Sequence, residues 1–253
     1  MKKIKTGKKE TITNAPYDTQ EMCFMDKNFV QVDLKDLNFA ETRFIKCCFY
    51  GCNLNFAKIQ NALLTKCSFY NCTFNTTNFT GTFFQQCNFI NCNGKHIEAN
   101  HTTWENCSWK KTQLSDSSFK KALFYACKWI KVDLSKGNFQ NSKWKKLKLR
   151  QIIANGIDCS EVTFQQVKAR KMISPYAVFH NNIFNRLYLS NSTLTYADFY
   201  ECQVKKLKIK NTQLDGSQNI IPMETNSKKT LLSIIILILC FLTASLIRYI
   251  IFQ

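Results

Sequence analysis

The chain has 253 residues, and its 35 Lys and Arg against 17 Asp and Glu give a formal net charge of +18. This length suits one large domain rather than several. The basic excess favours an anionic partner and argues against any function that needs an acidic surface.

Residues 1–21 are polar and basic and contain no apolar run. A secretory signal peptide needs an apolar stretch of about 7–15 residues, so this segment is not one. We expect a disordered basic arm over residues 1–21, which ends by capping the structure that follows it.

The next stretch, residues 22–217, repeats every five residues. Steps of five from Phe24 to Leu214 visit 39 positions, and 33 of these centres carry a large apolar side chain. A helix repeats about every 3.6 residues and a strand every 2, so neither explains this period alone. A second column, two residues before each centre, holds small residues such as Thr42 and Cys47. Small and large columns together can fill a tightly wound core, and the fixed short period predicts a solenoid.

The repeated motif is a small residue, then Asp or Asn, then Leu or Phe, then two variable positions. It occurs as Cys52-Asn53-Leu54, Cys87-Asn88-Phe89, Val132-Asp133-Leu134 and Ala197-Asp198-Phe199. With this pattern the chain resembles the pentapeptide repeat proteins over residues 22–217. The resemblance implies an all-β fold, a right-handed quadrilateral β-helix with twenty residues in each of about ten coils. Catalytic residues are no part of the family pattern, so we expect neither an enzyme nor a cofactor.

Six centres carry a small residue, and at five of them the residue two positions earlier is large. Ile97 precedes Ala99, for example, and Met172 precedes Ser174. Because volume moves from one column to the other, we expect the coils to stay packed. Gly94 and Pro175 predict local bulges.

Nine of the thirteen cysteines fall in the small column: Cys47, Cys52, Cys67, Cys72, Cys87, Cys92, Cys107, Cys127 and Cys202. We expect buried, reduced thiols that behave as small apolar residues. Cysteines that are twenty positions apart in the sequence would stack as a ladder with one thiol per coil. A metal site is disfavoured, since such a ladder does not bring several ligands to one point.

The carboxy-terminal part predicts a linker over residues 218–229 and a transmembrane α-helix over residues 230–252. No charge occurs between residues 231 and 247, and residues 231–252 would span about 33 Å as a helix, against a hydrocarbon core of about 30 Å. Lys228 and Lys229 precede the span, and Arg248 lies near its far end. The positive-inside rule then predicts a single-pass, tail-anchored protein with a cytoplasmic solenoid, in a bacterial inner membrane or, if secreted, a host membrane.

The four-sided frame assigns charges to faces. The outward positions are the residue before each centre and the two after it. Face 1 has its centres at residue 24 and every twentieth residue after it, and face 2 at residue 29 and every twentieth after it. Together these faces carry twenty basic residues against Asp26 and Glu105, whereas faces 3 and 4 carry six basic and eleven acidic residues.

Sixteen of the twenty basic residues gather in the carboxy-terminal half, and we predict that they form a binding face. They are Lys110, Lys111, Lys128, Lys131, Lys143, Lys145, Lys146, Lys148, Arg150, Lys168, Arg170, Lys171, Lys205, Lys206, Lys208 and Lys210. Near an anionic leaflet each Lys or Arg contributes about 1 kcal/mol of binding, so this face could lie against the membrane.

These observations favour a non-catalytic, tail-anchored scaffold or interaction protein that presents its basic face to anionic lipid or to a protein partner. Delivery as a bacterial effector and residence as an inner-membrane scaffold both stay open, as do the protein partner and the oligomeric state.

Three alternatives are disfavoured. Some pentapeptide repeat proteins protect topoisomerases from quinolones with an acidic, DNA-like rod, and the charge here has the opposite sign. A nucleic-acid-binding rod would need surface aromatics for stacking, but Tyr50, Tyr70 and Tyr125 are expected to be outward and isolated. An enzyme could use His96 and His101 with the nearby Glu98, but no nucleophile with a base partner accompanies them, and we interpret them as ordinary surface.

Overall fold

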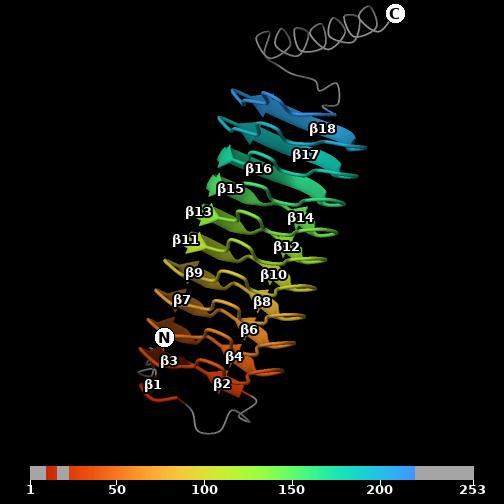
Figure 1. Ribbon diagram of the computed structural model, residues 1–253. Coiled ribbons are helices and arrows are strands. Elements are labelled where there is room, and N and C mark those ends of the chain that lie inside the picture. The colour runs from red at the N-terminus through yellow and green to blue at the C-terminus, as the bar shows by residue number, and fades with distance from the viewer. Residues whose placement is uncertain (1–9, 16–22, 220–253) are drawn as a thin grey trace, which may run out of the picture.

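The computed structural model describes residues 10–15 and 23–219, and these form one solenoid of eighteen parallel strands (Figure 1). Seven short strands lie on face 1: β2 (Cys23–Met25), β4 (Arg43–Ile45), β6 (Leu63–Thr65), β8 (Phe83–Gln85), β10 (Thr103–Glu105), β12 (Leu123–Tyr125) and β14 (Lys143–Lys145). Seven lie on face 2: β3 (Lys27–Val30), β5 (Cys48–Tyr50), β7 (Ser68–Tyr70), β9 (Asn88–Ile90), β11 (Ser108–Gln113), β13 (Lys128–Asp133) and β15 (Lys148–Ile153). Three longer strands run across both faces: β16 (Thr163–Ile173), β17 (Ile183–Ser190) and β18 (Gln203–Lys210).

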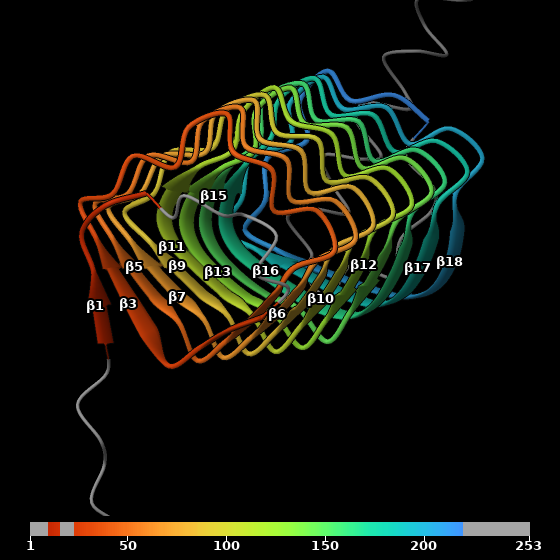
Figure 2. The ribbon, with the colours of Figure 1, turned by 90° about the horizontal axis from the view of Figure 1, so that it is seen from below.

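The strand register confirms the twenty-residue coil. Phe49 pairs with Phe69, and Trp109 pairs with Trp129, each in parallel with the residue twenty positions along the chain. Face 4 holds single bridges with the same offset, and face 3 holds single bridges together with the ends of β11, β13, β15 and β16. Seen from the end that holds β1, the chain turns clockwise as it recedes, so the solenoid is right-handed (Figure 2). An all-β solenoid of about ten coils is therefore confirmed.

The corners of each coil have a common backbone conformation. The second residue after nearly every centre has a positive φ, for example 54° at Lys46 and 52° at Asn71. This region disfavours residues that carry a Cβ. Hydrogen bonds between coils offset the cost, because the backbone N–H of Lys46 donates to Thr65 O at 2.8 Å and that of Asn71 to Ile90 O at 3.0 Å. The corner residues are thereby fixed with their side chains outward.

Both inward columns are buried along most of the rod, and large rings fill the axis, whereas Leu37, Cys202, Val204 and Leu214 are half-buried. Phe49 and Phe69 stack with their centroids 4.6 Å apart, and further along the rod Trp109 and Trp129 stack at 4.9 Å. Burying such a ring contributes about 2–3 kcal/mol, and a ring pair adds about 0.5–1.5 kcal/mol. The ring stacks run through the whole rod, so both of its halves share one core.

The exchange of volume between columns occurs as expected. Beside the small centres, Ile97, Ile152 and Ile157 are all buried in the core. The expected bulges are placed differently. Gly94 keeps its coil's register, and the register shift that the described strands show lies between Phe184 and Leu187, where β17 meets β18.

Part of the predicted disordered arm is ordered. Residues 10–12 form β1 (Glu10–Ile12), which pairs in parallel with β3, and Glu10 forms an ion pair with Lys27. Ile12 packs on the core, which covers the first coil with apolar surface and explains the pairing.

The predicted transmembrane helix, residues 230–252, lies outside the described residues. Within residues 10–15 and 23–219 we find no helix with the length and apolar character that a bilayer crossing requires.

Candidate interaction surface

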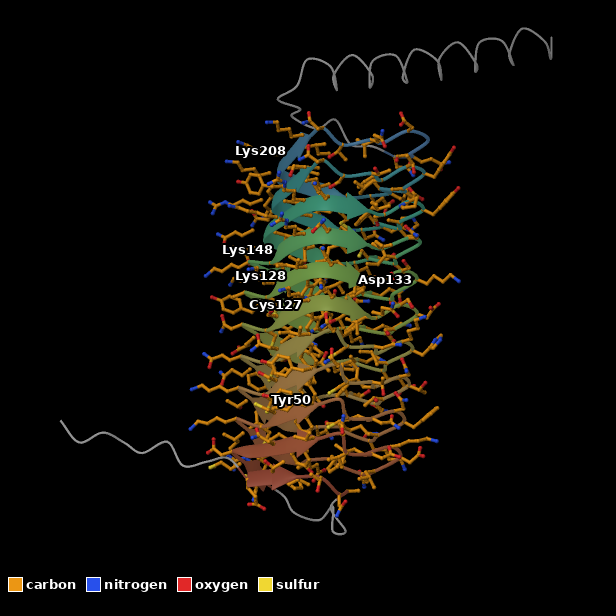
Figure 3. All side chains as sticks on the ribbon, turned by 90° about the vertical axis from the view of Figure 1, so that its left-hand side faces the viewer. Tyr50, Cys127, Lys128, Asp133, Lys148 and Lys208 are labelled. Carbon is orange, nitrogen blue, oxygen red and sulfur yellow. The ribbon has the colours of Figure 1, made fainter. Side chains whose placement is uncertain are left out.

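All sixteen residues of the predicted binding face are exposed, and we call them the basic surface. Their exposure follows from the coil, because the centre and the residue two before it point inward and leave the flanking positions to solvent. Strands β11, β13, β14, β15, β16 and β18 carry most of them. Figure 3 shows Lys128, Lys148 and Lys208 along one edge of the rod.

Strand register places like charges directly above one another. Lys128 pairs with Lys148, and Lys148 pairs with Lys168. Arg150 pairs with Arg170 in the column beside them. Neighbouring strands lie about 4.8 Å apart, and two unit charges at that distance repel by about 1 kcal/mol even in water. A ladder of this kind favours an anionic partner that relieves the repulsion.

Acidic side chains do not neutralise this ladder. The ion pairs of the described residues join Glu10 to Lys27, Lys35 to Asp36, and His180 to Asp198, and none of them includes a member of the basic surface. The positive charge of this surface is therefore directed to solvent.

Two tyrosines lie among the lysines of the basic surface. The Lys146 Nζ donates to the Tyr125 hydroxyl at 3.0 Å and lies 5.1 Å from the ring centroid, and the hydrogen bond lowers the pKa of Tyr125. Lys168 Nζ lies 5.9 Å from the Tyr188 ring. The expectation that Tyr125 is isolated is therefore corrected, because the strand register places a lysine beside it in the next coil.

Face 2 divides into two parts. Its outward positions between residues 28 and 91, the neutral half, carry no charge, whereas those between residues 108 and 211, the basic half, carry eleven basic and no acidic residues. In the neutral half Tyr50 and Tyr70 stack at 5.0 Å, which corrects the expectation that they are isolated. Val30 and Ile90 continue the same outward column on either side.

Faces 3 and 4 have different chemistry. On face 4, His180 and Asp198 are 2.8 Å apart, and Asn219 Nδ2 donates to the same carboxylate at 2.7 Å. Burial alone would raise the pKa of Asp198, but the hydrogen bonds from Asn219 and His180 lower it. Neither residue of this pair belongs to the basic surface.

A groove runs along the corner between faces 2 and 3, and we call it the corner groove. Its volume is about 630 Å³. One wall carries Lys111, Lys131 and Lys171, and the other carries Asp133, Ile153 and Ile173. The four-sided frame derived from the sequence contains both rows of residues, but only the structure shows the hollow between them.

The cysteine ladder lies inside the core. Cys47, Cys67 and Cys127 are buried, and their thiols donate to carbonyls of the preceding coil at 3.2–3.3 Å. Burial also raises the pKa of the Cys159 thiol well above its usual value. These thiols are placed as structural groups rather than as nucleophiles.

His96, Glu98 and His101 are exposed, and Glu98 accepts a hydrogen bond from Asn78 at 3.0 Å. Among the residues that the structure describes, His, Cys, Asp and Glu side chains form no group of three that could hold a metal ion.

The family model of pentapeptide repeats matches residues 28–55 and 57–93 with eight copies of the repeat. No curated protein matches the sequence.

Solved structures give weaker likenesses. The chain is 15% identical to HetL, a pentapeptide repeat protein involved in heterocyst differentiation regulation in the cyanobacterium Nostoc sp. strain PCC 7120, with 79% of this chain and 91% of that chain covered and a TM-score of 0.47. It is also 15% identical to full-length QnrB1, a plasmid-mediated fluoroquinolone resistance protein, with 90% and 94% covered and a TM-score of 0.31. At these identities and scores the likenesses carry no argument about function.

Proposed function

This chain is a pentapeptide repeat protein, and on that premise we propose that it is a non-catalytic scaffold whose basic surface lies against an anionic membrane leaflet. The observation that carries the proposal is the stacking of exposed Lys and Arg side chains, coil upon coil, without acidic partners. At about 1 kcal/mol for each basic residue near an anionic leaflet, about eight contacts correspond to micromolar-scale attachment, and the sixteen residues of the basic surface can supply them.

We further propose that residues 230–252 anchor the chain in the same membrane. The sequence between residues 231 and 247 is free of charge, and the basic surface is densest in the half of the rod that precedes this segment. Lys228 and Lys229 lie between the solenoid and the apolar segment, and by the positive-inside rule they favour a solenoid on the cytoplasmic side of the membrane. An anchor near the basic half would raise the local concentration of anionic lipid at the basic surface.

The neutral half of face 2 is compatible with this orientation. It presents Tyr50 and Tyr70 on the same face as the lysines, with Val30 and Ile90 in the same column. Tyrosine is enriched where a protein meets the membrane–water interface. The rod could therefore lie along the leaflet over its length rather than touch it at one end.

Topoisomerase protection by DNA imitation is the alternative class. It needs an acidic rod, and the exposed charge on faces 1 and 2 is basic. We therefore propose binding to an anionic surface rather than imitation of one.

The proposal is tested with vesicles and a chain that ends at Lys229, so that the apolar segment cannot contribute. We expect this chain to bind vesicles with anionic lipid at low salt, to be released at high salt, and to ignore neutral vesicles. The variant Lys128→Glu/Lys148→Glu/Lys168→Glu should lose binding. A matched variant with the same change in charge on faces 3 and 4, Lys58→Glu/Lys120→Glu/Lys136→Glu, should keep it. Equal loss in both variants would show that net charge alone is responsible.

A further inference from the structure

We infer that the corner groove is a binding site for an extended, acidic peptide in which acidic and apolar residues alternate. Its three lysines belong to the basic surface, but they lie at the edge of face 2 that turns toward face 3, and there we assign them to a peptide and not to the leaflet. In Figure 3, Lys128 lies at one end of β13 and Asp133 at the other, past the corner to face 3, and the groove follows the side of Asp133.

The first argument is the chemistry of the two walls. Lys111, Lys131 and Lys171 are corner residues with positive φ, so the backbone holds each of them outward along one line. The opposite wall presents Ile153 and Ile173, which are 44% and 49% exposed. The two isoleucines pair in neighbouring strands, so together they form a small apolar patch that apolar side chains of a ligand could cover.

The one acidic residue of the groove does not neutralise the lysines. Asp133 uses a carboxylate oxygen to accept the backbone N–H of Ser135 at 2.9 Å, and it makes no ion pair with another described residue. Each of the three lysines is therefore available to a ligand.

The second argument is length. Lys111 and Lys171 are three coils apart, which is about 14 Å at about 4.8 Å per coil. Five residues of extended peptide span about 13 Å, and their side chains point alternately to opposite sides. Lys131 lies about 5 Å along the groove from Lys111, so acidic residues at the first, third and fifth positions each come within about 2 Å, along the groove, of one lysine. Ile153 and Ile173 lie about 10 and 14 Å along the opposite wall, so the fourth position and a sixth would face them, and the second position would face Asp133.

A lipid fits this site less well. A lipid headgroup concentrates its charge at one end, so it would pair with one lysine and leave the other two without a partner. A peptide distributes its carboxylates along the groove as the lysines are distributed.

The test measures fluorescence anisotropy of labelled peptides with the full-length chain in detergent solution. The probe is Glu-Asn-Glu-Ile-Glu-Ile, and the comparison peptide of the same composition is Glu-Glu-Glu-Asn-Ile-Ile. We expect the alternating peptide to bind at least tenfold more tightly. The variant Lys111→Gln/Lys131→Gln/Lys171→Gln should weaken it at least tenfold, and Ile153→Asn/Ile173→Asn should also weaken it.

The matched control removes the same charge from the other edge of face 2. Lys128→Gln/Lys148→Gln/Lys168→Gln should change peptide affinity less than threefold, although it should impair vesicle binding. Equal affinity for the two peptides, or equal losses in the two lysine variants, would overturn the inference. If the groove variant lost vesicle binding and kept peptide binding, the groove would belong to the lipid surface and the inference would also fail, whereas the lipid proposal would stand.

Discussion

The neutral and basic halves of face 2 share one backbone and differ in what they present to solvent. In both halves each residue pairs with the residue twenty positions along, and rings stack in the centre, Phe49 on Phe69 and Trp109 on Trp129. The outward positions are uncharged in one half and carry eleven basic residues in the other. The residues of the inward columns therefore specify the coil, and the outward columns can differ in charge between the two halves without changing it.

The difference has an energetic side. Stacked lysines in the basic half repel one another, and the coil forms there with the same register as in the neutral half. The core rings contribute several kcal/mol per coil, against about 1 kcal/mol of repulsion per charged pair. The core can therefore carry an unfavourable surface, and that surface is consistent with selection for a partner rather than for stability.

The largest effect should come from the core, and it should be the same in the two halves. Phe69→Ala in the neutral half and Trp129→Ala in the basic half each remove a buried ring, so each should lower the free energy of unfolding by about 3–5 kcal/mol. Urea unfolding followed by circular dichroism measures both. A loss below about 1 kcal/mol in one half alone would show that the halves do not share one core.

A smaller effect is expected where the two halves meet. Thr102 Oγ1 accepts the Trp104 Nε1 hydrogen at 2.8 Å, so Thr102→Val leaves a buried N–H without a partner and should cost about 1–3 kcal/mol. The Thr102 hydroxyl also donates to Ala99 O at 2.6 Å, so the matched control is Thr77→Val, because the Thr77 hydroxyl donates to Leu54 O at 2.7 Å and accepts no hydrogen bond from a tryptophan. The control should lower the free energy of unfolding by less than half as much. Equal losses would show that the Trp104 hydrogen bond is not the cause.

The smallest effect concerns the charge ladder itself. Lys148→Gln removes a charge between Lys128 and Lys168 and should raise the free energy of unfolding by about 0.5–1 kcal/mol at low salt and by almost nothing at about 1 M salt. Lys58→Gln is the control, because Lys58 lies between Asn38 and Asn78. A salt-independent change at Lys148, or an equal change at Lys58, would contradict repulsion within the ladder.

The sequence predicted the parts of the fold that repeat. The period of five predicted which residues are the centres, which form the small column and which lysines point outward, because each position of the repeat has the same burial in every coil. The Tyr50–Tyr70 stack also follows from the repeat, since the two residues are twenty positions apart and occupy the same outward column.

Features that do not repeat could not be predicted in this way. β1 pairs with an offset of seventeen rather than twenty, so Ile12 falls outside the pattern. The register shift near Phe184 occurs where the period of large centres is unbroken. The corner groove depends on the space between two rows of side chains, and the order of residues in the sequence does not give that space.

The central claim is that the basic surface lies against an anionic leaflet, and the orientation of the rod tests it most directly. Ten coils at about 4.8 Å make a rod about 48 Å long. We would place the full-length chain in lipid nanodiscs and measure energy transfer from a dye at the amino terminus to acceptors on the lipid headgroups. The account predicts strong transfer in anionic nanodiscs and weak transfer in neutral ones, with the strong signal lost in Lys128→Glu/Lys148→Glu/Lys168→Glu. The same transfer in both lipids and in the variant would contradict it.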